Sequence, residues 1–332
     1  MKLVAFIIVV AYAFAIGNAL AQTQTKNETG NTLASPDTAE ASVKEAPPKP
    51  QKAPPLPFHT IEGYGGGSIT PMAYLVNQGP EGTIFGLPSG AYSQVFMPNG
   101  KKDLEAWTFT ETLFRRLELG YGLDRLGLGT LPQDISDATD VGIRRHHVLL
   151  HNFNARALLL EENSFKLPVP ALTFGTHFKY NDGIQQIDHA LGGALKDIGL
   201  EKSNGVDFTL TSTKTFMLPV INRPLIVTAG MRGSSAAQIG FLGYGDKWRP
   251  SFEGNVAFLP TDWLLVAYEL RQKKSPYSKI PGLIEEEDPW NAIDASWIIN
   301  SHMTLVGGWG AFGKVTNKRE NGTWFLQLKY EI

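Results

Sequence analysis

The last nine residues of the chain alternate between apolar and polar side chains, which is the period-two pattern of a β-strand. The apolar face carries Trp324, Leu326, Leu328, Tyr330 and Ile332. The opposite face carries Gln327, Lys329 and Glu331, with Phe325 as its one apolar member. In an outer-membrane β-barrel, one row of side chains meets lipid while the next points into a polar lumen. The stretch therefore predicts the closing strand of such a barrel.

The same alternation recurs through most of the chain. Twelve stretches carry it, at about 89–97, 104–113, 116–126, 140–151, 168–180, 205–217, 223–233, 250–259, 262–274, 290–299, 302–313 and 322–332. In one of the clearest, Val266 and Tyr268 alternate with Glu269 and Arg271. The least regular is 140–151, where polar groups occupy both faces. The pattern predicts an all-β fold, a transmembrane antiparallel β-barrel of about twelve strands.

The lengths of the connections support a barrel. Short ones are expected at 114–115, 218–222, 260–261 and 300–301, and long ones near 127–139, 181–204, 234–249 and 275–289. Bacterial barrels alternate short periplasmic turns with long external loops. The connection 152–167 departs from this rhythm, because it is long where a short turn is due. With twelve strands, both chain ends fall on the periplasmic side.

Residues 61–76 allow two interpretations. Their glycine-rich run, 63–67, lacks the Gly-Lys-Ser/Thr ending of a phosphate-binding loop. If the wall has twelve strands, the segment is a plug that folds into the lumen or against its periplasmic mouth. If the segment instead supplies two wall strands, the barrel has fourteen.

The N-terminal region has the composition of a targeting segment and a tether. Residues 1–21 combine Lys2, an apolar core and the small-x-small sequence Ala19-Leu20-Ala21, as in a secretory signal peptide. Residues 22–57 have little apolar content and end in a proline-rich run, which predicts a disordered periplasmic linker. Residues 58–332 then form the expected barrel domain.

Composition narrows the class further. The formal net charge of -2 argues against a nucleic-acid partner, which requires a clustered basic face. The chain has 0 cysteines, so it can form neither disulfides nor a thiolate metal site. Beyond the N-terminus no apolar run approaches the roughly 18–20 residues of a spanning helix. If the chain crosses a membrane, it does so with strands.

Aromatic residues cluster near the ends of the expected strands. These are Trp107, Trp263, Trp290, Trp297, Trp324 and Tyr330. Interfacial girdles of Trp and Tyr occupy such positions in membrane proteins. A soluble β-protein also places Trp near strand ends, so the pattern favours the membrane barrel only modestly.

Several segments are similar to a known family. The run from Gln238 to Gly254, together with Gly65 to Pro71, Asp207 to Leu210 and Tyr268 to Arg271, resembles the bacterial family called domain of unknown function 3034. The resemblance extends from about Glu62 to Ile332. It implies an envelope location and a barrel fold, and it supplies no catalytic or ligand-binding residues.

Five charged residues on the polar rows are candidates for lining the lumen. They are Lys179, Glu253, Glu269, Arg271 and Lys329. A strongly ion-selective pore would show rings of one sign, whereas these signs are mixed. The mixture suits either a narrow, weakly selective channel or a barrel closed by internal salt bridges.

No catalytic or metal site is expected. His147 and His151 share a strand face, but residues four apart on a strand lie about 13 Å apart, too far to share one ion. No cofactor is implied. The chain has no Gly-x-Ser-x-Gly sequence, so an enzyme is not expected, although an outer-membrane barrel hydrolase stays an alternative.

The pattern indicates a porin-like protein of a Gram-negative outer membrane. The leading hypothesis is a narrow channel or export-related barrel for a small polar or amphipathic solute. Its expected partners are outer-membrane lipid and, through the C-terminal strand, the barrel assembly machinery. The competing hypothesis is a soluble secreted or periplasmic β-sandwich that binds an envelope glycan, with its apolar rows facing each other.

Overall fold

The computed structural model describes residues 58–278 and 286–331. The expected signal peptide 1–21 and linker 22–57 lie outside the described residues, as does Ile332.

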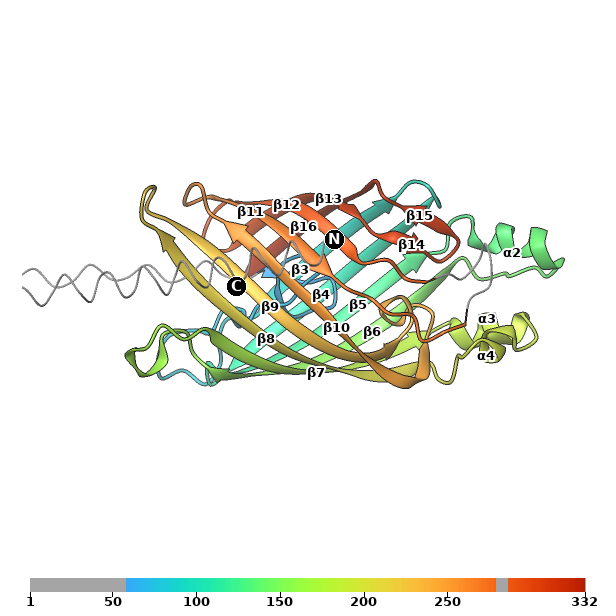
Figure 1. Cartoon of the computed structure of the whole chain (residues 1–332), viewed down its shortest axis with the longest axis horizontal. Helices are drawn as coiled ribbons and strands as arrows, with labels where there is room; N and C mark the ends of the chain where they lie inside the picture. The colour runs from blue at the N-terminus through green and yellow to red at the C-terminus, as the bar shows by residue number, and fades with distance from the viewer. Residues whose placement is uncertain (1–57, 279–285, 332) are drawn as a thin grey trace, which may run out of the picture. The chain divides into compact units, whose positions relative to one another are not determined.

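A single closed antiparallel sheet forms the body of the protein (Figure 1). Its strands are β3 (Ser89–Met97), β4 (Lys102–Leu113), β5 (Leu117–Gly127), β6 (His147–Leu160), β7 (Ala171–Asp182), β8 (Asn204–Leu218), β9 (Arg223–Ala236), β10 (Tyr244–Phe258), β11 (Leu264–Arg271), β12 (Trp290–Ile298), β13 (Met303–Ala311) and β16 (Thr323–Glu331). Each pairs with its sequence neighbour in this series, and β16 pairs with β3 to close the ring. The predicted twelve-stranded barrel is confirmed. The fourteen-stranded alternative is wrong, and so is the β-sandwich, because in the described residues the twelve wall strands close into one ring and the two other sheets have only two strands each.

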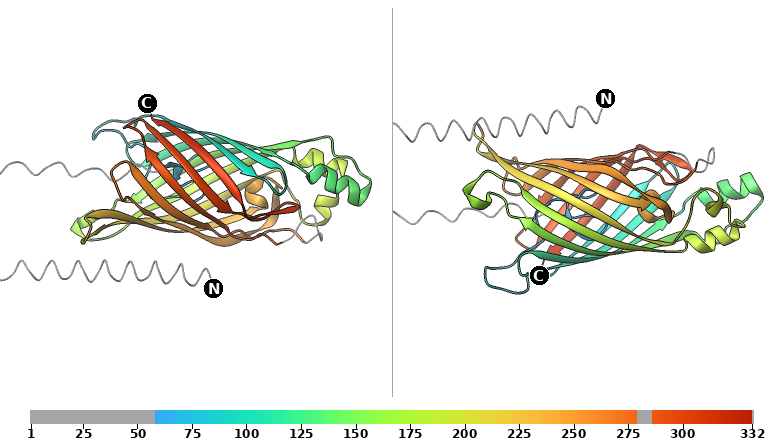
Figure 2. Two further views of the ribbon diagram at one scale, coloured as in Figure 1. Left: turned by 90° about the horizontal axis from the view of Figure 1, so that it is seen from above. Right: turned by 60° about the horizontal axis from the view of Figure 1, so that its bottom comes forward.

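The two ends of the barrel differ. One end, here called the turn end, carries the connections 114–116, 161–170, 219–222, 259–263 and 299–302. The other, the loop end, carries 98–101, 128–146, 183–203, 237–243, 272–278, 286–289 and 312–322. The helices α2 (Leu131–Thr139), α3 (Ile184–Ala190) and α4 (Ala194–Asp197) gather at the loop end, as Figures 1 and 2 show.

Shorter elements complete these connections. They are the 3-10 turns η1 (Ser164–Lys166) and η2 (Gln238–Gly240) and the hairpin of β14 (Gly313–Val315) with β15 (Lys318–Glu320). No helix in the described part of the chain is long and apolar enough to cross a membrane.

One predicted strand is wrong. The structure has no strand over 140–146, and β6 instead runs through most of the expected connection 152–167. Val148 and Leu150 are buried inside the barrel while Leu149 lies on the other face, so both faces are apolar at this level. Where the barrel interior is apolar, inward and outward residues of a strand are alike, and the alternation that predicts strands is lost. The sequence pattern therefore misplaces this strand.

The outer face of the wall is apolar. In β16 every second residue is exposed, and Trp324, Leu326, Leu328 and Tyr330 are between 44% and 62% exposed. The same face of the other strands exposes Trp107, Phe109, Phe153, Phe174, Phe178, Leu210, Met231, Phe252, Val266, Tyr268, Ile293 and Trp297. These apolar rows face outward, as the alternation predicted.

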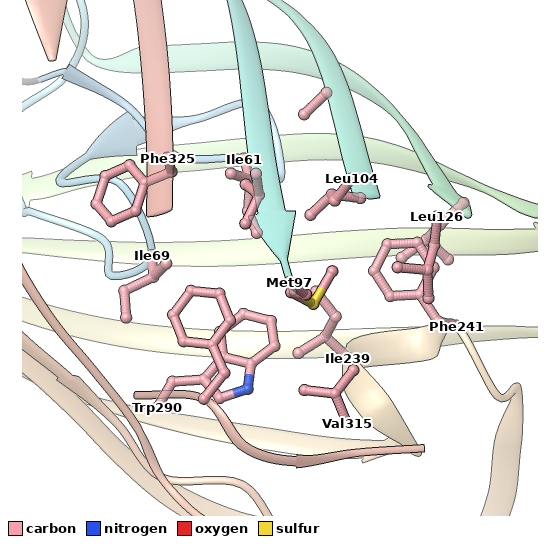
Figure 3. Packing of buried hydrophobic residues seen from close by; sticks show 14 of the residues in the cluster. Ile61, Ile69, Met97, Leu104, Leu126, Ile239, Phe241, Trp290, Val315 and Phe325 are labelled. Carbon is pink, nitrogen blue, oxygen red and sulfur yellow. The ribbon is translucent and has the colours of Figure 1, made fainter. Parts of the chain in front are cut away.

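Toward the loop end, the interior is filled by apolar side chains (Figure 3). Met97, at the end of β3, and Leu104, near the start of β4, belong to this cluster. Loop residues fold in beside them, including Ile239, Phe241 and Val315. Trp290, expected in an outer girdle, is instead 4% exposed, and its ring stacks on Phe312 at 4.6 Å between centroids.

Candidate functional site

The first described segment of the chain lies inside the barrel. From His59 to Val76, every side chain except that of Tyr74 is buried. The short strands β1 (Phe58–His59) and β2 (Gly65–Gly66) pair with each other and do not join the wall. The blue ribbon at the start of the described chain shows this segment among the strands in Figures 1 and 2. Residues 58–76 are called the plug below.

Two wall glycines let the plug backbone approach β5 closely. A Cβ atom added at Gly120 would lie 2.1 Å from the carbonyl oxygen of Gly63, and one at Gly122 would lie 2.7 Å from that of Glu62. Gly63 itself has φ +84°, a conformation that favours glycine. The plug backbone therefore packs directly against the backbone of β5, and a side chain at either glycine would displace the plug.

A first anchor holds both ends of a plug loop. Glu118 on β5 accepts hydrogen bonds from the amides of Gly65 at 3.0 Å and Val76 at 2.8 Å. Arg156 on β6 pairs with Glu118 at 2.9 Å and donates to the carbonyl of Gly65 at 2.7 Å and to that of Met72. The ion pair thus provides hydrogen-bond partners for buried backbone groups of the plug.

A second anchor binds consecutive plug amides. Glu269 on β11 accepts from the backbone N–H of Ser68 at 2.7 Å, Ile69 at 3.2 Å and Thr70 at 2.9 Å. The hydroxyl of Thr70 also donates to this carboxylate. A Cβ at Gly67 would lie 2.4 Å from Glu269, so glycine leaves the room that the carboxylate occupies.

The third anchor centres on a carboxylate of the plug. Arg271 on β11 donates to both oxygens of Glu62, with Nη1 2.5 Å from Oε2 and Nη2 3.2 Å from Oε1. Lys179 on β7 pairs with Oε1, and Arg232 on β9 lies 3.5 Å from Oε2. Burial opposes ionisation of Glu62, but Arg271, Lys179 and Arg232 outweigh it and hold its pKa well below the usual range.

Two wall carboxylates complete this anchor. Asp207 lies 2.9 Å from Lys179 and 3.2 Å from Arg232, and Glu253 lies 3.2 Å from Arg232 and 3.7 Å from Arg271. Lys179, Arg232 and Arg271 thus face Asp207, Glu253 and the plug's Glu62. We call these six residues the central cluster, and with the plug in place its positive and negative charges balance.

The five residues singled out from the sequence are distributed over three places. Lys179, Glu253 and Arg271 meet in the central cluster, and Glu269 forms the neighbouring anchor. Lys329 is 2% exposed and pairs with Glu331 at 2.5 Å on β16.

The sequence interpretation did not single out Arg156, and it gave Glu62 no role. Arg156 follows Asn152 and Asn154 on the inward row of β6, within the range 152–167 that the sequence predicts as a connection. Glu62 has no strand pattern of its own from which a role could be inferred.

A small cavity reaches the central cluster from the loop end. Its volume is about 30 Å³, and its lining includes Arg232 and Arg271. Five cationic side chains line it, those of Arg232, Arg249, Arg271, Lys273 and Lys274, against the two carboxylates of Asp207 and Glu287. We call this space the basic vestibule.

The described residues offer no obvious catalytic or metal-binding arrangement. Among them, no group of three or more His, Asp or Glu side chains could hold a metal ion. The rings of His59, His151, His177 and His302 form hydrogen bonds with Thr, Tyr and Asn side chains or a backbone carbonyl, and within the described residues no histidine ring bonds a serine hydroxyl. The expectation that the chain is not an enzyme stays a prediction.

Fold and site together define a class: a closed twelve-stranded antiparallel barrel with an apolar exterior and an ion-paired internal plug. The chain belongs to the family described as protein of unknown function (DUF3034), whose model matches residues 57–329. The family suggested by the sequence is therefore confirmed. Among curated proteins, no sequence matches the chain.

Solved barrel structures share the fold only distantly. CdiB from Acinetobacter baumannii aligns with 75% of this chain at 7% identity and a TM-score of 0.35, and the chain spans 60% of its length. The Salmonella typhi outer membrane phospholipase (OMPLA) dimer with bound calcium aligns over 77% of this chain and 95% of its own, with 8% identity and a TM-score of 0.35. Salmonella typhi OmpF in complex with daunomycin aligns over 75% and 97%, with 10% identity and a TM-score of 0.30. At such TM-scores these likenesses support no conclusion, and the barrel assignment rests on this chain's own strand pairing.

Proposed function

We propose that this protein is an outer-membrane barrel that passes a small polar or amphipathic solute and is closed, in the state described, by its own plug. The observation that carries the proposal is the polar, ion-paired contact between plug and wall. A periplasmic tether before residue 58 and insertion through the C-terminal strand by the barrel assembly machinery belong to the same proposal.

The outer face supports a membrane location. Large apolar side chains such as Phe153, Phe178 and Leu326 are between 44% and 54% exposed around the wall. Soluble monomers rarely expose apolar surface on this scale, because each exposed Å² costs roughly 25 cal/mol in water. An apolar belt is stable when lipid covers it. A closed barrel tolerates lipid because its strands pair with each other around the whole ring and leave no open sheet edge.

The character of the plug contact supports movement. A barrel needing only to be filled could use apolar side chains, since buried ion pairs recover little net stability after desolvation. Here the plug is held by carboxylates and guanidinium groups that water or a charged solute can also satisfy. Such a contact can open because water or a solute replaces each polar partner, whereas opening an apolar seal would expose apolar surface to water.

The apolar cluster at the loop end forms a second barrier. Ile239 and Phe241 come from the connection 237–243, and Val315 comes from the hairpin of β14 and β15. Conduction therefore requires these connections to move as well as the plug. Connections at a barrel rim can shift without breaking the strand ladder, so the wall can stay intact during opening.

A reversible lock between plug and wall tests the proposal. The backbone nitrogen of Ala73 lies 2.7 Å from the hydroxyl of Thr213 on β8, and the chain has 0 cysteines to interfere. We expect Ala73→Cys with Thr213→Cys to form a disulfide under oxidation and to abolish single-channel steps in planar bilayers. Reduction should restore the steps of the wild-type protein.

The single variant Ala73→Cys is the matched control, and it should conduct equally under both redox conditions. Equal conductance of the oxidised and reduced double variant would show that the plug does not gate the pore. Absence of conductance from wild-type and reduced protein alike would refute the channel function.

A further inference from the structure

The central cluster contains an anion site that the plug now fills. Three cations on three different wall strands, β7, β9 and β11, converge on the one carboxylate of Glu62. Arg271 grips it with two guanidinium nitrogens, the paired geometry by which arginine recognises carboxylates and phosphates. The side chains of Lys179 and Arg271 are 0% and 3% exposed, so neither can turn to solvent instead.

The wall by itself is not neutral at this level. Without Glu62, the carboxylates within ion-pair distance of Lys179, Arg232 and Arg271 would be those of Asp207 and Glu253. One positive charge of the cluster would then lack an ion-pair partner, and an anion is the group that can pair with it and accept its hydrogen bonds. Withdrawal of the plug therefore favours binding of an anion by these three cations.

The basic vestibule offers a route to that position. Arg249 is in register with Ser234, two residues beyond the Ser251–Arg232 pair that borders the cluster. Lys273 follows Arg271 by two residues and lies with its amine 4.6 Å from the ring centroid of Trp290. Cationic side chains thus continue from the loop end down to the groups that hold Glu62.

Part of this lining is uncommitted. Arg249 and Lys274 are exposed, and their side chains form no ion pair or hydrogen bond within the described residues. Lys273 is paired with Glu287 at 3.3 Å. Free cations at the rim of a narrow entry raise the local concentration of anions and speed their capture.

We propose that the three cations of the central cluster bind a small anionic solute through a carboxylate or phosphate group, and that this group enters by the basic vestibule and displaces Glu62. Glu62 then acts as a built-in competitor for the site. The inference rests on the proposed function and deepens it, because it assigns a charge to the solute that the barrel passes.

Binding measurements test the site directly. Sodium succinate and sodium phosphate are titrated by calorimetry into the full-length protein in non-ionic detergent, so that the two arms distinguish a carboxylate from a phosphate. Glu62→Gln should tighten binding of at least one probe about tenfold, because the competing charge-assisted contacts are lost. Arg249→Gln should weaken it about threefold, the scale expected for an exposed charge.

The matched control is Lys247→Gln, which removes the same charge two residues away. The side chain of Lys247 is 77% exposed, and it does not line the vestibule, so its binding constants should equal those of the wild type. Failure of both probes to bind any form would overturn the proposal. So would equal binding by folded Glu62→Gln and wild type.

Folding of each variant is checked by heat-modifiable migration on a gel. If Glu62→Gln does not fold, Arg249→Gln decides the question, because Arg249 is exposed and its loss leaves no buried charge. Equal affinities for Arg249→Gln and Lys247→Gln would then refute the vestibule route and the proposal with it.

A conductance measurement separates this inference from the channel function. In planar bilayers under a KCl gradient, the reversal potential of Glu62→Gln should shift toward chloride relative to wild type. Conductance with a preference for potassium would overturn the anion site and leave the channel function standing. Anion binding without any conductance would support the site and refute the channel function.

Discussion

At the scale of single residues, the interior depends on a few groups that serve plug and wall together. Glu62 is the clearest, because one carboxylate from the plug meets Lys179, Arg232 and Arg271. Gly120 is its counterpart in the wall, since the missing side chain makes room for the carbonyl of Gly63. The ion pairs of Glu62 and the close contact between Gly63 and Gly120 together determine the position of the plug in the barrel.

A single methyl group at Gly120 tests this fit. Its Cβ would lie 2.1 Å from the carbonyl oxygen of Gly63, a backbone atom that cannot rotate away. We expect Gly120→Ala to displace the plug and to cost about 1–3 kcal/mol, the usual range for overpacking. Urea unfolding of the detergent-solubilised barrel measures the change.

Gly90→Ala on β3 is the control, because its Cβ would meet only the carbonyl of Thr108 at an ordinary 3.5 Å. It should change the free energy of unfolding by less than about 0.5 kcal/mol. A similar loss in both variants would mean that strand glycines, and not the plug contact, determine the effect.

At the scale of elements, the β14–β15 hairpin closes the loop end by a buried ion pair. Glu320 pairs with Lys102 at 3.4 Å, and both side chains are 0% exposed. The same carboxylate accepts from the amides of Gly100 at 2.7 Å and Asn99 at 3.1 Å. The hairpin is thereby fastened to the turn 98–101, and it carries Val315 into the apolar cluster.

Glu320→Gln should therefore loosen this end of the barrel. It leaves the Lys102 amine buried without its charged partner, which typically costs about 3–5 kcal/mol. The temperature at which the folded gel band converts to the unfolded one should fall.

Arg319→Gln gives the comparison, since it breaks the exposed pair with Asp288 at 2.8 Å, where about 1 kcal/mol or less is expected. An equal shift from the two variants would contradict the role assigned to the Glu320–Lys102 pair.

The sequence predicts elements well only where the two faces of a strand differ. In β16 and β11 exposed apolar residues alternate with Lys329 or Glu269, and the strands lie where the pattern placed them. Where the interior is apolar, as at Leu150 and Trp290, the contrast between the two faces fails, so the pattern places the start of β6 too early and puts Trp290 on the outer face.

The site was harder to predict because its contacts are not local. Glu62 lies 117 residues from Lys179 and 209 from Arg271, so no spacing in the sequence links them. One usable signal was present in β5, where Gly120 and Gly122 stand on the inward row. Two side chains missing from one face of a wall strand indicate that something else fills the space.

At the scale of the whole molecule, each wall strand needs apolar side chains on its outer face and polar side chains around the plug on its inner face. Leu328, near the middle of β16, is 44% exposed on the outer face. We expect Leu328→Arg to destabilise the barrel in lipid by about 2–4 kcal/mol, the cost of a cation near the bilayer midplane. The fraction of heat-modifiable protein after refolding into vesicles measures this.

Ser301→Arg adds the same charge in the exposed turn 299–302 and should refold as wild type does. Normal refolding of Leu328→Arg would mean that hydrocarbon does not cover this face, and the membrane location would be abandoned.

The plug precedes every wall strand in the chain, yet its contacts extend to the final one, where Gln327 donates to the carbonyl of His59 at 2.7 Å. The plug is thus synthesised before all twelve wall strands, but its contact with Gln327 can form only after β16 has been made. While the intervening strands pair, the glycine-rich residues of the plug lack this partner from the final strand. The segment that fills the barrel interior is therefore part of the same chain, and it completes its contacts only when the wall is complete.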